Sequence, residues 1–160
     1  MSFIRGTLLF LALLAAAYAR LGESREELVA RLGRVRLESQ HFITAQRQLS
    51  PLGPALFFEK DQWGIQCDMV DGRCARITYQ KKGIWTPEQI TMLLQNNAQN
   101  QKWSETRDSA KTIRKWVRSD SGTARWLFTG SMEFVSPAYL AAKARREAEL
   151  KALAERKPDL

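Results

Sequence analysis

Two neighbouring segments in the second half of the chain alternate basic side chains with tryptophan. The face of a tryptophan ring can stack on a bound group, and a nearby cation can pair with an anion on the same ligand. The same alternation is expected of an antiparallel sheet with one face in water, where it carries no function. Both interpretations stay open for one candidate binding cluster: Arg114, Lys115, Trp116, Arg118, Arg125 and Trp126.

The chain around this cluster is basic. From Arg76 to Arg118 there are nine Lys or Arg against three Asp or Glu, and the formal net charge of the whole chain is +8. Such an excess favours an anionic glycan, an anionic lipid headgroup or an acidic protein surface as partner. A moderate positive charge also aids solubility without any partner.

Side chains that could carry catalysis are few. His41 is the single histidine, and it lies in a strand-like segment without a recognisable nucleophile or acid signature around it. The spacing of the cysteines and the histidine does not suit a four-ligand metal site. Asp68 and Asp71 fall short of a calcium loop, which needs more carboxylates and a closing Glu. We therefore expect a protein that is not an enzyme and has no metal or cofactor, with a small hydrolase that uses His41 as the distant alternative.

Cys67 and Cys74 are the two cysteines, and they flank the turn at Asp71-Gly72. A two-residue Asp-Gly turn would pair Cys74 with Met69, which makes the cysteines diagonal neighbours on one face of a hairpin. Diagonal Cα separations lie near the upper limit of what a disulfide spans. A bulged three-residue loop would instead place the cysteines on opposite faces. A disulfide between them and two separate thiols both remain open.

Residues 1–19 have the pattern of a cleavable secretory signal. Arg5 supplies a positive start, an apolar run follows from Gly6 to Ala17, and Ala17-Tyr18-Ala19 offers small residues at the two positions that signal peptidase reads. The run is short for a membrane-spanning helix, which needs about 20 apolar residues. We expect cleavage after Ala19 and a soluble product in the periplasm or outside the cell, or a membrane-anchored protein if the signal is retained. Export makes nucleic acid an improbable partner.

The helices and strands that position these residues can be predicted from helix-capping residues and from the alternation of apolar with polar residues. Helices are predicted over 23–33 and 87–98, because Ser24 with Glu27 and Thr86 with Gln89 have the spacing of capping boxes. Residues 96–109 are predicted to be a loop, and a charged helix is predicted from Ser136-Pro137 to about Arg156. Alternating apolar patterns predict strands at residues 35–45, 63–69 and 74–80, with an apolar and aromatic stretch at 55–59 before the second of them. Two or three further strands are predicted over 112–118, 123–129 and 132–135.

This order of elements predicts an α+β fold. We expect an antiparallel sheet of about five to six strands with two short packed helices and a C-terminal charged helix. The expected organisation is a signal peptide at residues 1–19, a single α+β domain at 20–136 and a helical tail at 137–160. The tail is rich in alanine and balanced in charge, which is typical of a solvated helix or of a surface that binds a partner.

Residues 22–79 resemble a recurring envelope module. The sequence Gly-Glu-Ser-Arg-Glu-Glu-Leu-Val-Ala-Arg-Leu-Gly at 22–33, and the hairpin at 65–79 with its Asp71-Gly72 turn, are similar to the small outer-membrane assembly lipoproteins of the BamE (SmpA/OmlA) type. The secreted β-lactamase-inhibitor-like proteins share this plan of a helix followed by an antiparallel sheet. The chain departs from the module because it lacks a lipid-bearing cysteine after the signal and continues into a second helix and further strands. As a whole it is similar to small secreted bacterial proteins that end in a strand and a charged tail.

From these observations we expect a non-catalytic binding or scaffolding domain of the bacterial cell envelope. Its partner would be an envelope protein, recognised through a sheet face or through the tail. The alternative is a binder of an anionic glycan or lipid that uses the Arg114–Arg125 strands.

Overall fold

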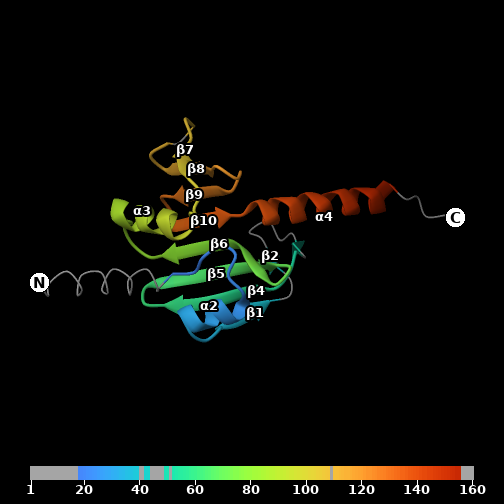
Figure 1. The fold of residues 1–160 in the computed structure, drawn as a ribbon, viewed down its shortest axis with the longest axis horizontal. Coiled ribbons are helices and arrows are strands. Elements are labelled where there is room, and N and C mark those ends of the chain that lie inside the picture. The colour runs from blue at the N-terminus through green and yellow to red at the C-terminus, as the bar shows by residue number, and fades with distance from the viewer. Residues whose placement is uncertain (1–17, 40–41, 44–48, 51, 109, 156–160) are drawn as a thin grey trace, which may run out of the picture.

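The computed structural model describes residues 18–155 except 40–41, 44–48, 51 and 109 (Figure 1). The described part is α+β, as the sequence predicts. In chain order its elements are α2 (Arg25–Leu32), β1 (Leu37–Ser39), β2 (Phe42–Ile43), β3 (Leu49–Ser50), β4 (Ala55–Lys60), β5 (Trp63–Val70), β6 (Arg73–Lys81), α3 (Pro87–Asn96), β7 (Trp103–Glu105), β8 (Ile113–Arg118), β9 (Thr123–Leu127), β10 (Ser131–Val135) and α4 (Pro137–Glu155). Residues 1–17 of the predicted signal peptide and His41 lie outside the described residues.

The two short helices begin where their capping signals predict. Ser24 Oγ accepts a hydrogen bond from the backbone N–H of Glu27, and the Glu27 carboxylate accepts from the N–H of Ser24. Thr86 and Gln89 form the same reciprocal box at the start of α3. Each box satisfies N–H groups that the first helical turn leaves without a partner. α2 and α3 are therefore local structures that the sequence specifies directly.

Eight antiparallel strands form the main sheet in the order β1-β4-β5-β6-β10-β9-β8-β7. This exceeds the five to six strands expected, and the edge strands β1 and β7 have only three residues each. β7 falls in the segment predicted to be a loop, which corrects that prediction. It forms because Trp103–Glu105 pairs with Arg118–Trp116 of β8, the next strand along the chain, and three residues are too few to show an alternating pattern.

The sheet has two unlike faces. α2, α3 and the segment before α2 cover one face and enclose the main core, which includes Leu28, Leu93 and the rings of Trp63 and Phe134. The second face carries a small cluster at one end, where α4 begins, formed by Val70, Ala75, Val135, Tyr139 and Ala142. Beyond that cluster none of the described helices packs on the second face, which carries both apolar and polar side chains. We call it the open face of the sheet.

α4 leaves the sheet and extends away from it (Figure 1). Only Tyr139 and Ala142 of this 19-residue helix are buried, and both lie in its first two turns. The rest of the described helix is stabilised by ion pairs along its own surface, such as Lys143 with Glu147 and Lys151 with Glu155. Among the described residues, no helix is long and apolar enough to cross a membrane.

Candidate functional site

The register of β8 and β9 divides the predicted binding cluster between the two faces of the sheet. Arg114 lies opposite Trp126 and Trp116 opposite Ala124, and these residues share the core face with Arg118. Trp116 and Trp126 are only 5% and 9% exposed. Lys115 lies opposite Arg125, and this pair belongs to the open face. The six residues therefore do not form one surface, and the two tryptophans serve the core.

Arg118 is a buried structural residue. Its guanidinium donates to both carboxylate oxygens of Asp120, at 2.8 and 2.7 Å, and to the buried backbone carbonyl of Asn97 at 2.8 Å. It also lies 5.5 Å from the centre of the Trp103 ring. The guanidinium lowers the pKa of Asp120. Arg118 thus joins the end of α3, the edge strand and the β8–β9 turn, and its charge is unavailable to a ligand.

The other three cations of the cluster also have acidic partners. Arg114 forms a two-bond pair with Glu105, at 2.9 and 2.7 Å, and stacks 4.9 Å from the centre of the Trp116 ring. Lys115 pairs with Asp108, and Arg125 approaches Glu133 at 3.5 Å. Each of the four cations of the cluster is therefore paired with a carboxylate in the fold. This pairing weakens the case for an anionic ligand on β8 and β9.

The open face presents a continuous row of side chains across seven strands. Leu37 pairs with Phe57, Phe57 with Gln66, Gln66 with Thr78, Thr78 with Glu133, Glu133 with Arg125 and Arg125 with Lys115. The row is apolar at the β1 end, where Leu37 is 61% exposed, and charged at the β8 end. A row of this kind offers a flat, mixed surface of hydrophobic, amide, hydroxyl and ionic groups.

A partly buried ionic network connects the open face to α4. Arg76 of β6 lies 3.4 Å from the Asp68 carboxylate and 3.0 Å from that of Glu133, and it donates to the Tyr139 hydroxyl at 2.9 Å. Gln66 donates to Asp68 at 2.7 Å. Burial raises the pKa of Asp68 despite these partners. The network fixes the first turn of α4 against the sheet, so the direction in which the helix projects is set by the domain.

The sequence analysis did not single out this network. Asp68, Arg76 and Glu133 each occupy a polar position of an alternating strand, which is also the pattern of ordinary solvent-facing residues. These three side chains come together because β10 pairs with β6, although a long stretch of chain separates the two strands. The sequence feature that could have indicated this network is Tyr139, an aromatic residue at the start of an otherwise alanine-rich helix.

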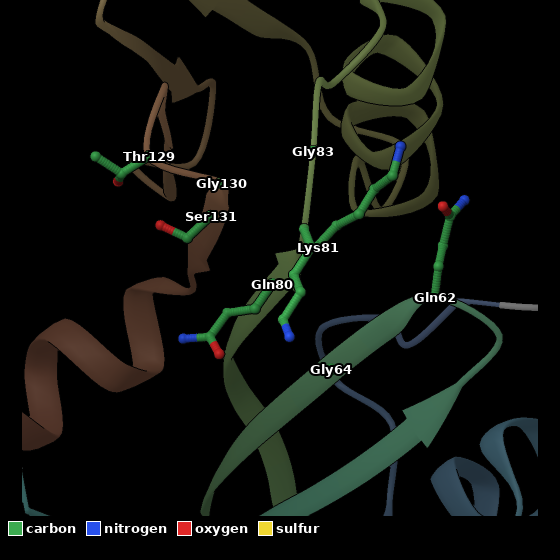
Figure 2. Close-up of a pocket in the computed structure, with 9 residues that line it drawn as sticks. Gln62, Gly64, Gln80, Lys81, Gly83, Thr129, Gly130 and Ser131 are labelled. Atoms are coloured by element: carbon green, nitrogen blue, oxygen red, sulfur yellow. The ribbon is translucent and has the colours of Figure 1, made fainter.

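A pocket of about 800 Å³ opens between the end of β6 and the β9–β10 turn (Figure 2). Its lining combines two lysines with amides, hydroxyls and glycines and includes no carboxylate: Gln62, Gly64, Gln80, Lys81, Lys82, Gly83, Thr129, Gly130 and Ser131. The Lys81 ammonium already donates to Gln89 Oε1 at 3.0 Å and to the carbonyl of Ile84 at 3.2 Å. Lys82 is exposed, so the pocket can offer one uncommitted cation to an anion.

Cys67 and Cys74 are free thiols, and both are buried in the main core. Cys74 pairs with Met69, as an Asp-Gly turn predicts, and Asp71 and Gly72 both have the positive φ of such a turn. Cys67 lies opposite Ile77 because the register shifts between Asp68 and Met69. Burial and the neighbouring Cys67 raise the pKa of the Cys74 thiol well above its usual value. Neither thiol has the features of a reactive nucleophile.

Among the described residues, no group of three or more His, Cys, Asp or Glu side chains is placed to hold a metal ion. His41, the general base of the distant hydrolase alternative, lies outside these residues.

Comparison with known proteins yields little. No family model and no curated protein matches the chain. One solved structure is similar: an extracellular protein containing an SCP domain from Bacillus anthracis str. Ames, with a TM-score of 0.42 and 11% sequence identity. The similar region covers 78% of this chain and 46% of that protein, so the chain spans less than half of its length.

Proposed function

We propose that this chain is an exported, non-catalytic binding domain of the bacterial cell envelope that recognises a protein partner. The binding surface in this proposal is the open face of the sheet together with the exposed part of α4. The observation that carries it is that the described helices α2 and α3 cover only one face of the sheet. The row from Leu37 to Lys115 lies on the other face, from which α4 projects with only its first two turns buried. The resemblance of residues 22–79 to envelope modules favours the same compartment.

The chemistry of this surface suits a protein better than a small molecule. A mixed row of apolar and charged groups on a flat sheet matches the composition of protein interfaces, whereas small ligands bind in enclosed pockets. α4 adds exposed leucines at Leu140, Leu150 and Leu153. Lys115 and Arg125 keep 42% and 51% of their side-chain surface exposed although each is paired. A partner can therefore exchange these exposed ion pairs at small cost.

Quantitative capture from a native envelope extract tests the proposal. The full chain is compared with a truncation after Arg145, which keeps the buried Tyr139 and Ala142, and with the double variant Lys115→Glu/Arg125→Glu. We expect each change to reduce recovery of the same partner at least tenfold. Arg34→Glu, a charge reversal at an exposed residue in the α2–β1 connection, serves as control. Equal recovery by all forms would reject the proposed surface.

The alternative partner is an anionic glycan or lipid headgroup, and the lysine pocket of Figure 2 supports it better than β8 and β9 do. The supporting observation is that the described lining includes no carboxylate and contains the exposed Lys82 together with Thr129 and Ser131. Binding to anionic vesicles that falls with salt and is abolished in Lys82→Glu would favour this function. Binding that is unchanged in Lys82→Glu would exclude it at this pocket.

A further inference from the structure

The segment just before α2 is joined to the fold by hydrogen bonds on both sides. The backbone N–H of Gly22 donates to the carbonyl of Cys74 at 2.7 Å, and the N–H of Cys74 donates to the carbonyl of Glu23 at 2.8 Å. The N–H of Leu21 donates to the side chain of Asn97 at 3.0 Å. These bonds connect the segment with β6 and with the end of α3. The domain therefore begins before its first helix.

Ala19 belongs to the main core, and the partly buried Tyr18 packs against that core. Ala19 is 0% exposed, and its carbonyl accepts a hydrogen bond of 2.6 Å from the hydroxyl of Tyr79, which is itself completely buried. The Tyr18 ring packs edge-to-face on Trp63, with centroids 5.9 Å apart, and on Tyr79 at 6.4 Å. The last two residues of the predicted signal thus fill space in the folded domain.

Cleavage after Ala19 would damage this core. It would remove the acceptor of the buried Tyr79 hydroxyl, and a buried donor without a partner is unfavourable. It would also expose the aromatic cluster that Tyr18 covers. The new α-amino group at Arg20 would lie near the Glu23 carboxylate, which accepts from the Arg20 N–H at 2.9 Å. That contact would neutralise the new charge, but it replaces neither of the two core residues.

We infer that the exported domain keeps Tyr18 and Ala19, and that its processing site lies after Ala17. Ala15 and Ala17 supply small residues at the two positions that signal peptidase reads, two residues upstream of the pair Ala17 and Ala19. Water adds across the Ala17–Tyr18 peptide bond, so the released leader ends in the Ala17 carboxylate and Tyr18 carries the new α-amino group. The mature chain then starts at its first core residue. The inference rests on the export proposed above.

The intact mass of the exported protein tests this directly. The full chain is produced in a bacterium with an active export system, and protein from the periplasmic and membrane fractions is weighed. A mass that begins at Tyr18 is expected. A mass that begins at Arg20, or an envelope-located chain that retains its leader, overturns the inference while leaving export intact. A chain found only in the cytoplasm with its leader overturns the proposed function as well.

Two matched variants locate the site independently of folding, because precursor and product are measured by mass in denatured whole-cell extracts. Ala15→Leu disrupts the pair Ala15 and Ala17 and leaves Ala17 and Ala19 unchanged, so we expect the precursor to accumulate at least tenfold. Ala19→Leu disrupts only the downstream pair, and we expect cleavage before Tyr18 to continue. The reverse pattern, with processing blocked by Ala19→Leu and normal in Ala15→Leu, refutes the inference.

Discussion

Arg118→Ala is expected to destabilise the fold far more than Arg114→Ala, although both arginines lie on the core face of β8. The Arg118 side chain is 1% exposed and its partner Asp120 is 34% exposed. In the other pair, Arg114 and Glu105 are each 37% exposed. The two substitutions therefore remove the same chemical group from a buried and from a half-exposed ion pair on one strand.

The expected loss in the free energy of unfolding depends on which groups lose their partner when each arginine is replaced by alanine. Without Arg118, the buried carbonyl of Asn97 loses its donor, which costs about 1–3 kcal/mol. Breaking a buried ion pair costs about 3–5 kcal/mol in all, and Asp120 recovers some water, so a total of about 3 kcal/mol is expected. Removing one partner of an exposed pair costs about 0.2–1 kcal/mol, which is the expectation for Arg114→Ala. The two variants should differ by about 2 kcal/mol.

Urea unfolding followed by tryptophan fluorescence measures this difference. With an m-value of about 2 kcal/mol/M, the midpoint should fall by about 1.5 M in Arg118→Ala and by less than about 0.5 M in Arg114→Ala. Arg118→Lys should be intermediate, because an ammonium cannot reproduce the planar fork that reaches Asp120 and Asn97 together. Equal midpoints for the two alanine variants would refute the structural role of Arg118. A large loss in Arg118→Ala would mean that ligand-binding assays on this variant report folding.

Three further predictions concern other parts of the fold. Cys67 and Cys74 should resist iodoacetamide at pH 8 in the native protein and react in denaturant, because they are buried; a pair that stays unreactive in denaturant and weighs two hydrogens less would instead be a disulfide. Asp120 has a lowered pKa in the fold, so its contribution to stability is present above its unfolded pKa and lost as the pH falls through the folded value. Asp120→Asn should therefore lower the free energy of unfolding at pH 7 and match the parent protein near the acid limit in urea titrations. Gly130→Ala should destabilise by about 1–3 kcal/mol, since φ is +103° and a Cβ would lie 2.8 Å from the backbone oxygen of Lys81; an unchanged melting temperature would contradict this.

Local chemistry accounts for the parts of the fold that the sequence predicted well. The capping boxes at Ser24 and Thr86 and the hairpin at Asp71-Gly72 involve residues within a few positions of one another, so their spacing is visible along the chain. The edge strand at Trp103 was missed because three residues are too few to show an alternating pattern, and the strand forms by pairing with β8. The bulge that moves Cys67 opposite Ile77 lies within the hairpin itself and was missed because the turn sequence indicates only the pairs next to the turn.

The candidate site also shows the difference between what local sequence patterns predict and what only tertiary contacts decide. Arg114 and Arg118 look alike in the sequence, since both are arginines at alternate positions of one strand beside tryptophan. Their different environments depend on the position at which α3 ends. Arg118 donates to the carbonyl of Asn97, whereas Arg114 pairs with the exposed Glu105. The expected binding cluster was predicted from composition, and composition does not reveal which cations pair with carboxylates in the fold.

The sequence by itself determined the class of the protein: an α+β chain with an antiparallel hairpin, two capped helices, a charged helix at its C-terminal end and a leader-like start. These features are short-range, and their signals are the types and spacing of neighbouring residues. Only the tertiary structure decided that the cations of the basic strands pair with carboxylates, that no described helix covers one face of the sheet beyond the start of α4, and that Ala19 is buried in the core with Tyr18 packed against it. Each of these depends on contacts between segments far apart in the chain, such as the hydrogen bond from Tyr79 to Ala19. Such contacts give a structural role to residues that no local sequence pattern distinguishes.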